Sequence, residues 1–93
     1  MGHKLIVKPL AEIEMAEALE WYENSKQGLG LELLEQIDAC LDRIVNNPEH
    51  FQKRYREIKI VYTKRFPYGI HYTFESGTVY VHALLHTKRE PRK

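Results

Sequence analysis

The sequence predicts an α+β fold with the order strand, helix, helix, strand, strand, strand (βααβββ). Two segments of the first half carry apolar residues at helical spacing, three runs of the second half alternate apolar and polar residues, and turn-forming residues separate these elements. We expect the helices to form a hairpin on one face of a small, mainly antiparallel four-stranded sheet. All 93 residues, 1–93, are predicted to form one domain, because a chain of this length supports one hydrophobic core.

The first half is predicted to supply one short strand and both helices. The run Leu5-Ile6-Val7 should be a strand that ends at Lys8-Pro9, because proline lacks a backbone donor and suits the first turn of a helix. Helical spacing begins at Leu10, breaks between Asn24 and Gly28, and ends at Asn46-Asn47-Pro48. The residues expected to pack in the core are Ala11, Met15, Ala18, Leu19, Trp21, Tyr22, Leu33, Leu34, Ile37, Leu41, Ile44 and Val45.

The second half is predicted to be a meander of three strands after a connection over Glu49 to Arg56. Turns are expected at Phe66-Pro67-Tyr68-Gly69 and at Glu75-Ser76-Gly77, where Gly77 can adopt a positive φ. One face should carry Ile58, Ile60, Tyr62, Ile70, Tyr72, Phe74, Val79, Val81, Ala83 and Leu85. The alternate residues should border an open face, namely Lys59, Thr63, Arg65, His71, Thr73, Tyr80, His82 and His86.

Charge is distributed unevenly along the chain, although the net charge is only +1. Residues 1–49 carry four Lys/Arg and ten Asp/Glu, a balance of −6, whereas residues 50–93 carry ten and three, a balance of +7. A basic half of this kind attracts nucleic acid or an acidic protein partner, or is simply a solvated surface.

Several classes of function are not indicated by the sequence. The single cysteine, Cys40, cannot form an internal disulfide, and no apolar run is long enough for a signal core or a membrane span, so we expect a cytoplasmic protein. The chain has no glycine-rich phosphate loop after a strand and no metal-binding spacing around Cys40. We therefore expect no metal, no small-molecule cofactor and no membrane partner.

Two histidines are the strongest candidates for chemistry. His82 and His86 are four apart on one predicted strand, so their side chains should point the same way about 13 Å apart, too far to share a metal. Either could transfer protons near neutral pH, and Arg or Lys beside it could hold a phosphate during metal-free cleavage of RNA. The same surface would equally well bind an acidic peptide through its cations and a sheet edge.

The chain resembles the RelE/ParE superfamily of small bacterial toxins from type II toxin–antitoxin modules, and in particular the ParE-like group called plasmid stabilisation proteins. The resemblance covers nearly the whole chain. It is carried by Ala-Leu-Glu-Trp-Tyr at 18–22, Gly28-Leu29-Gly30, the segment 44–48, Phe66-Pro67-Tyr68 with Ile70 and Tyr72, and His86-x-x-Arg89-x-Pro91.

This resemblance implies two different mechanisms. RelE-like members cut messenger RNA on the ribosome, which would assign His86 as proton donor and Arg65, Lys59 and Arg89 as phosphate ligands. ParE-like members inhibit DNA gyrase by binding, and Gly69 stands where the nuclease branch commonly has an arginine. The first hypothesis is thus a gyrase-binding toxin neutralised by a cognate antitoxin, and the alternatives are a ribosome-dependent endoribonuclease or a degenerate, non-toxic member.

Under the binding hypothesis, partner contacts are expected from residues around the open face. These residues are Tyr80, His82, His71, Tyr72 and Lys64.

Overall fold

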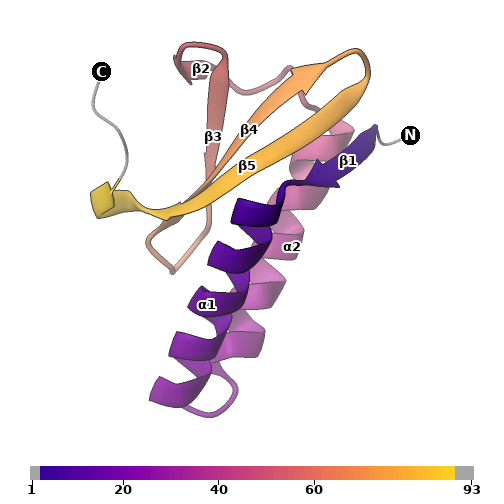
Figure 1. Cartoon of the computed structure of the whole chain (residues 1–93). Helices are drawn as coiled ribbons and strands as arrows, with labels where there is room; N and C mark the ends of the chain where they lie inside the picture. Colours follow the sequence, from indigo (N-terminus) through magenta and orange to yellow (C-terminus); the bar gives the residue numbers. More distant parts are fainter. Residues whose placement is uncertain (1–2, 90–93) are drawn as a thin grey trace.

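The structure has two helices on one face of a mixed five-stranded sheet with the strand order β1-β5-β4-β3-β2 (Figure 1). It is a computed structural model that describes residues 3–89, except for the side chain of Arg89. The elements are β1 Lys4–Val7, α1 Pro9–Ser25, α2 Leu29–Asn46, β2 Lys53–Tyr55, β3 Ile58–Tyr62, β4 Tyr68–Glu75, β5 Thr78–His86 and a 3-10 helix η1 Thr87–Arg89. β1 pairs in parallel with β5 and the other neighbours are antiparallel. The predicted α+β class is confirmed.

The extra strand, β2, lies where a connection was predicted. Its three residues, Lys53–Tyr55, pair with β3 across an irregular register. Arg56 follows in the left-handed region, with φ of 50°. A short edge strand with two basic residues shows no apolar alternation, so the sequence pattern did not indicate it.

The helical hairpin begins and ends close to the predicted residues. α1 starts at Pro9, and its end is joined to α2 through Gly28, whose φ is 88°. The carboxylate of Glu23 accepts the backbone N–H groups of Gly28 and Gly30, which are donors at the start of α2. A Cβ at Gly30 would lie 2.8 Å from the carbonyl oxygen of Leu19, so glycine allows the two helices to approach closely there.

The main core lies between the helices and the sheet. Its buried members include Leu33, Ile37 and Ile44 from α2 and Ile70, Tyr72, Val79, Val81 and Leu84 from the strands. β4 therefore follows the predicted alternation, but β3 does not. Val61 pairs with Ile70 on the helix side, whereas Ile60 pairs with His71 on the other face. Because β3 has consecutive apolar residues, either set of alternate residues could face the helices. In the structure Val61 faces them and Ile60 does not, which is the reverse of the prediction.

Candidate partner-binding groove

A groove of about 410 Å³ runs between α1 and the C-terminal part of β5. We call it the α1/β5 groove. Its lining residues are Glu14, Glu17, Ala18, Trp21 and Tyr22 from α1, Tyr68 from β4, and Leu84 and His86 from β5. Its wall is thus aromatic and aliphatic, and its α1 rim carries two carboxylates.

The groove exists because β1 is much shorter than β5. β1 pairs with Thr78 to Val81, and the last backbone bond runs from Lys8 N to the carbonyl of Val81. Pro9 then begins α1, which leaves the plane of the sheet, while β5 continues to His86 (Figure 1). The N–H of Leu84 donates instead to Oε1 of Glu14 on α1, at 2.9 Å. Among the described strands, none pairs with the outer edge of β5 beyond Val81.

A β-bulge at His82 directs the end of β5 toward the groove. Val81 pairs with Tyr72 and Ala83 with His71, so His82 is an extra residue in β5. The bulge shifts the alternation by one position, and Leu84 and His86 therefore line the groove on the helix side. The prediction that His82 and His86 point the same way was wrong for this reason.

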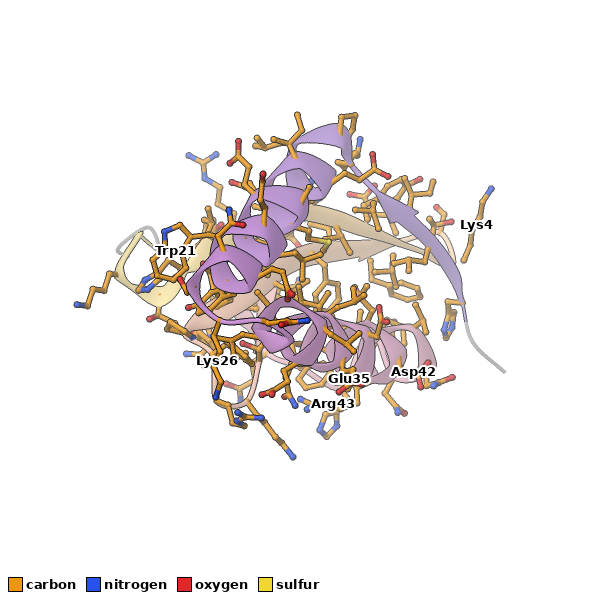
Figure 2. The ribbon with its side chains drawn as sticks, turned by 90° about the horizontal axis from the view of Figure 1, so that it is seen from below. Lys4, Trp21, Lys26, Glu35, Asp42 and Arg43 are labelled. Carbon is orange, nitrogen blue, oxygen red and sulfur yellow. The ribbon has the colours of Figure 1, made fainter. Side chains whose placement is uncertain are left out.

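Aromatic rings form one wall of the α1/β5 groove. Tyr22 makes edge-to-face contacts with Trp21 and Phe66, with ring centroids 4.9 and 5.1 Å apart, and Tyr68 contacts His86 at 5.5 Å. Trp21 is 63% exposed on the outer side of α1, toward the end of β5 (Figure 2). The prediction that Trp21 packs in the core was wrong. Tyr22, by contrast, packs against the core as expected.

The opposite face of the sheet, which is the face away from the helices, carries paired polar residues rather than an open cationic surface. A 2.8 Å hydrogen bond joins the Tyr55 hydroxyl to Nδ1 of His71, and another of 2.8 Å joins the Thr73 hydroxyl to Nε2 of His82. His71 is only 1% exposed, so the expectation that it borders open surface was wrong. Thr73 is likewise buried. The four side chains form two separate pairs: Tyr55 of β2 bonds His71 of β4 across the intervening strand β3, whereas Thr73 of β4 bonds His82 of the adjacent strand β5.

His82 is half-buried and favours its neutral form. Burial lowers the pKa of His82, and the positive charge of Lys8 lowers it further, while Glu75 acts in the opposite direction. The ammonium of Lys8 also lies 5.5 Å from the ring centroid of Tyr80, which is half-buried on the same face. Of the predicted partner-binding residues, Tyr80 and His82 thus keep partial exposure.

One comparison with known proteins identifies the family, and a second one matches the fold. The model of the family described as "ParE toxin of type II toxin-antitoxin system, parDE" matches residues 5–91. The chain belongs to the ParE toxin family. The fold also matches a solved structure titled "Chromosomal ParDE TA system from P. aeruginosa", with a TM-score of 0.76 and 10% sequence identity over 90% of this chain and 95% of that chain. No curated protein is significantly similar in sequence.

Within this ParE-family fold, the residues proposed for nuclease chemistry occupy separate positions. Lys59 is 9% exposed on the helix side, where its ammonium and the Tyr72 hydroxyl both donate to the carbonyl of Pro48, at 3.1 and 2.8 Å. The expectation that Lys59 borders the open face was wrong, because its long stem packs beneath the helices. Tyr72 is fully buried, so it presents no surface to a partner.

The loop between β3 and β4 holds the other basic candidates. Arg65 has a φ of 71° and its guanidinium donates to Oε1 of Glu32 on α2 at 2.8 Å. Lys64 beside it is exposed, as expected, whereas the Thr63 hydroxyl is buried and donates to the carbonyl of Phe66. Neither Arg65 nor Lys64 lines the α1/β5 groove.

His86 itself is positioned by the start of η1. The backbone N–H of Lys88 donates to Nδ1 of His86 at 3.2 Å, which makes that nitrogen the acceptor of the ring. Arg89 belongs to η1, but its side chain lies outside the described part of the structure. Lys59, Arg65 and His86 each contact different neighbours, so the contacts of these three side chains do not bring them together as one phosphate-binding site.

Residues 3–89 show neither a cluster of metal ligands nor a helix that could span a membrane. Within residues 3–89, no three His, Cys, Asp or Glu side chains are grouped so that they could hold a metal ion. In the same range, neither helix combines the length and apolar character that crossing a membrane requires.

Proposed function

We propose that this chain is a growth-inhibiting toxin that binds DNA gyrase and is neutralised by a protein antitoxin. The observation that carries the proposal is the ParE family match over residues 5–91, together with the ParDE-like fold. The site of action would be the cytoplasm, where gyrase works. The separate positions of Lys59, Arg65 and His86 favour an action by binding over the alternative of RNA cleavage.

Antitoxin recognition should use apolar anchors as well as charge. Exposed ion pairs contribute little to binding, whereas buried aromatic residues often dominate it. Trp21 in the α1/β5 groove is a large aromatic residue of the kind that serves as an anchor. A complex held in this way should persist at moderate salt.

The test is DNA supercoiling by purified gyrase in the presence of the isolated chain. We expect supercoiling to fall with increasing toxin and to recover when the protein encoded by the neighbouring reading frame is added first. Undiminished supercoiling at a large molar excess of correctly folded toxin would contradict the proposal. Cuts in a translated message in the ribosomal A site would support the nuclease alternative instead.

A further inference from the structure

The positive charge of the second half gathers along the edge of the sheet that β2 forms. Residues 50–65 hold six Lys/Arg and one Asp/Glu, which is Glu57. β2 is the outermost strand on this side, and β1 lies at the other edge of the sheet (Figure 1). Glu57 is already paired with Lys53 at 2.7 Å. The cations of this segment that are exposed and form no ion pair with a carboxylate of residues 3–89 are Arg54, Arg56 and Lys64.

Aromatic rings hold two guanidinium groups at this edge. The guanidinium carbon of Arg54 lies 5.7 Å from the ring centroid of Tyr62. That of Arg43, in the last turn of α2, lies 5.7 Å from the ring centroid of Phe51. Both pairs lie where α2 meets β3, since the thiol of Cys40 on α2 donates to the carbonyl of Tyr62 at 3.5 Å. An arginine held against a ring loses less conformational freedom when it binds an anion, so these two side chains are prepared for binding.

Arg56 lies in the turn between β2 and β3 in a conformation that arginine rarely adopts. Its φ is 50°, in the left-handed region that Gly, Asn and Asp adopt at lower cost. Because Tyr55 pairs with Ile58, the turn has two residues, of which Arg56 is the first. Backbone strain of this kind is concentrated at functional sites. The turn therefore presents a positive charge at the end of the hairpin at the expense of stability.

The spacing of the cations favours the backbone of double-helical nucleic acid as the ligand. The five residues of β3 span about 13 Å, so the turn before β3 and the loop after it are separated by the length of about four base pairs. Proteins that bind single strands stack bases on exposed aromatic faces. Here Tyr62 and Phe51 carry guanidinium groups over their rings, so these rings position charge instead of bases.

We propose that Arg43, Arg54, Arg56 and Lys64, which together we call the basic edge, bind the phosphate backbone of duplex DNA, so that the toxin contacts the DNA on which gyrase works. The choice of DNA rests on the proposed action on gyrase. None of the four residues lines the α1/β5 groove. Contacts of this kind do not depend on base sequence and weaken as salt is added.

Fluorescence anisotropy of a short labelled DNA duplex, without gyrase, tests the basic edge. We expect a Kd between about 1 and 100 µM, and a plot of log Kd against log salt concentration with a slope of about 3. Arg54→Gln should weaken binding about fivefold and lower this slope by about 1. Lys4→Gln removes one exposed charge at the opposite edge of the sheet and should change Kd by less than about twofold. Equal effects of the two variants would overturn the assignment.

Arg56→Asn separates a binding role of this arginine from a structural one. Asparagine tolerates a positive φ, so the Tm should stay the same or rise by up to about 5 °C while DNA binding weakens about fivefold. A lower Tm with unchanged DNA binding would show that Arg56 serves only the turn, and it would remove this residue from the basic edge.

Single-stranded RNA and poly-glutamate, measured in the same way, distinguish the classes of ligand. The duplex should bind most tightly. Tighter binding of poly-glutamate would overturn the proposal in favour of an acidic protein partner, and tighter binding of the RNA would overturn the choice of a duplex. Because gyrase is absent, failure to bind DNA would remove the basic edge and leave gyrase inhibition intact. Undiminished supercoiling by gyrase, with DNA binding as expected, would contradict the proposed function alone.

Discussion

The two parts of β5 place their histidines in different environments: His82 is hydrogen-bonded within the sheet, whereas His86 lines a groove. Tyr80 before the bulge and His82 at the bulge face away from the helices, and His82 is bonded to Thr73. After the bulge, His86 stands in a groove beside an exposed tryptophan and two carboxylates. Residue type alone marks both histidines as candidates, but of the two it is His86 that lines the α1/β5 groove. The comparison teaches that residue type alone does not decide which side chains can meet a partner, because the fold determines which of them stay accessible.

The largest effect on stability is expected when an isoleucine is replaced by alanine on the helix side of the sheet, and the same change on the opposite face provides the comparison. Ile70 is 0% exposed in the main core, whereas Ile60, at 6%, lies on the opposite face outside that cluster. Ile70→Ala should lower the free energy of unfolding by about 3 to 5 kcal/mol, because the surrounding core cannot collapse into the cavity. Ile60→Ala should cost about half as much. Urea denaturation measures both, and equal costs would mean that the opposite face is packed as a second core.

A smaller effect is expected from removing one hydroxyl on each face. Burial raises the pKa of Tyr72 to about 12, so its hydroxyl remains a donor to the carbonyl of Pro48 at ordinary pH. Tyr72→Phe should cost about 1 kcal/mol, because Lys59 still donates to that carbonyl. Tyr55→Phe should cost about 1 to 2 kcal/mol through loss of the bond to His71. Thermal denaturation compares the two variants, and a neutral Tyr55→Phe would refute a structural role for the polar pair.

The pH dependence of stability should report on His82. Its pKa is lowered in the folded chain, so the unfolded chain binds the proton more readily. The stabilising contribution is therefore present above the unfolded pKa and is lost as the pH falls through the folded value. The free energies of unfolding of the wild type and of His82→Asn should be measured from about pH 8 to 5. The difference between the two proteins should become smaller as the pH falls, because the wild type loses the contribution of His82. His50→Gln, at an exposed site, is the control. Parallel curves for the wild type and His82→Asn would show that folding does not change the pKa of His82.

The smallest effect is expected at the ion pair between Arg65 and Glu32. Both side chains are largely exposed, at 64% and 45%. Glu32→Gln should change the unfolding free energy by at most about 0.5 kcal/mol, and added salt should reduce the difference further. A loss of about 2 kcal/mol or more would mean that the loop between β3 and β4 depends on this pair.

The sequence was sufficient for the elements that have a regular pattern. The two helices and the strands β3 to β5 follow apolar spacing, and Gly77 has the positive φ expected of its turn, at 78°. The bulge at His82 could not be predicted from the sequence, because no glycine marks it and a polar residue at that position fits the alternation of a regular strand. Every face assignment after that residue was therefore shifted.

The candidate site was harder to predict than the fold. Lys59 reads as a surface cation, yet its ammonium reaches a carbonyl beneath the helices. Trp21 reads as core at helical spacing, yet its exposure depends on how α1 crosses the end of β5. Both outcomes are set by tertiary packing between elements distant in the sequence, which local periodicity does not report.

We propose that the α1/β5 groove, with Trp21 as an anchor, recognises the antitoxin, and that the opposite face of the sheet does not. A screen of all single substitutions for toxins that still arrest growth but escape co-expressed antitoxin tests it most directly. We predict that escape substitutions gather among the lining residues of the groove, with Glu17 and Trp21 prominent. Escape substitutions gathered at Tyr55, Thr73 and Tyr80, with the groove tolerant of change, would contradict the account.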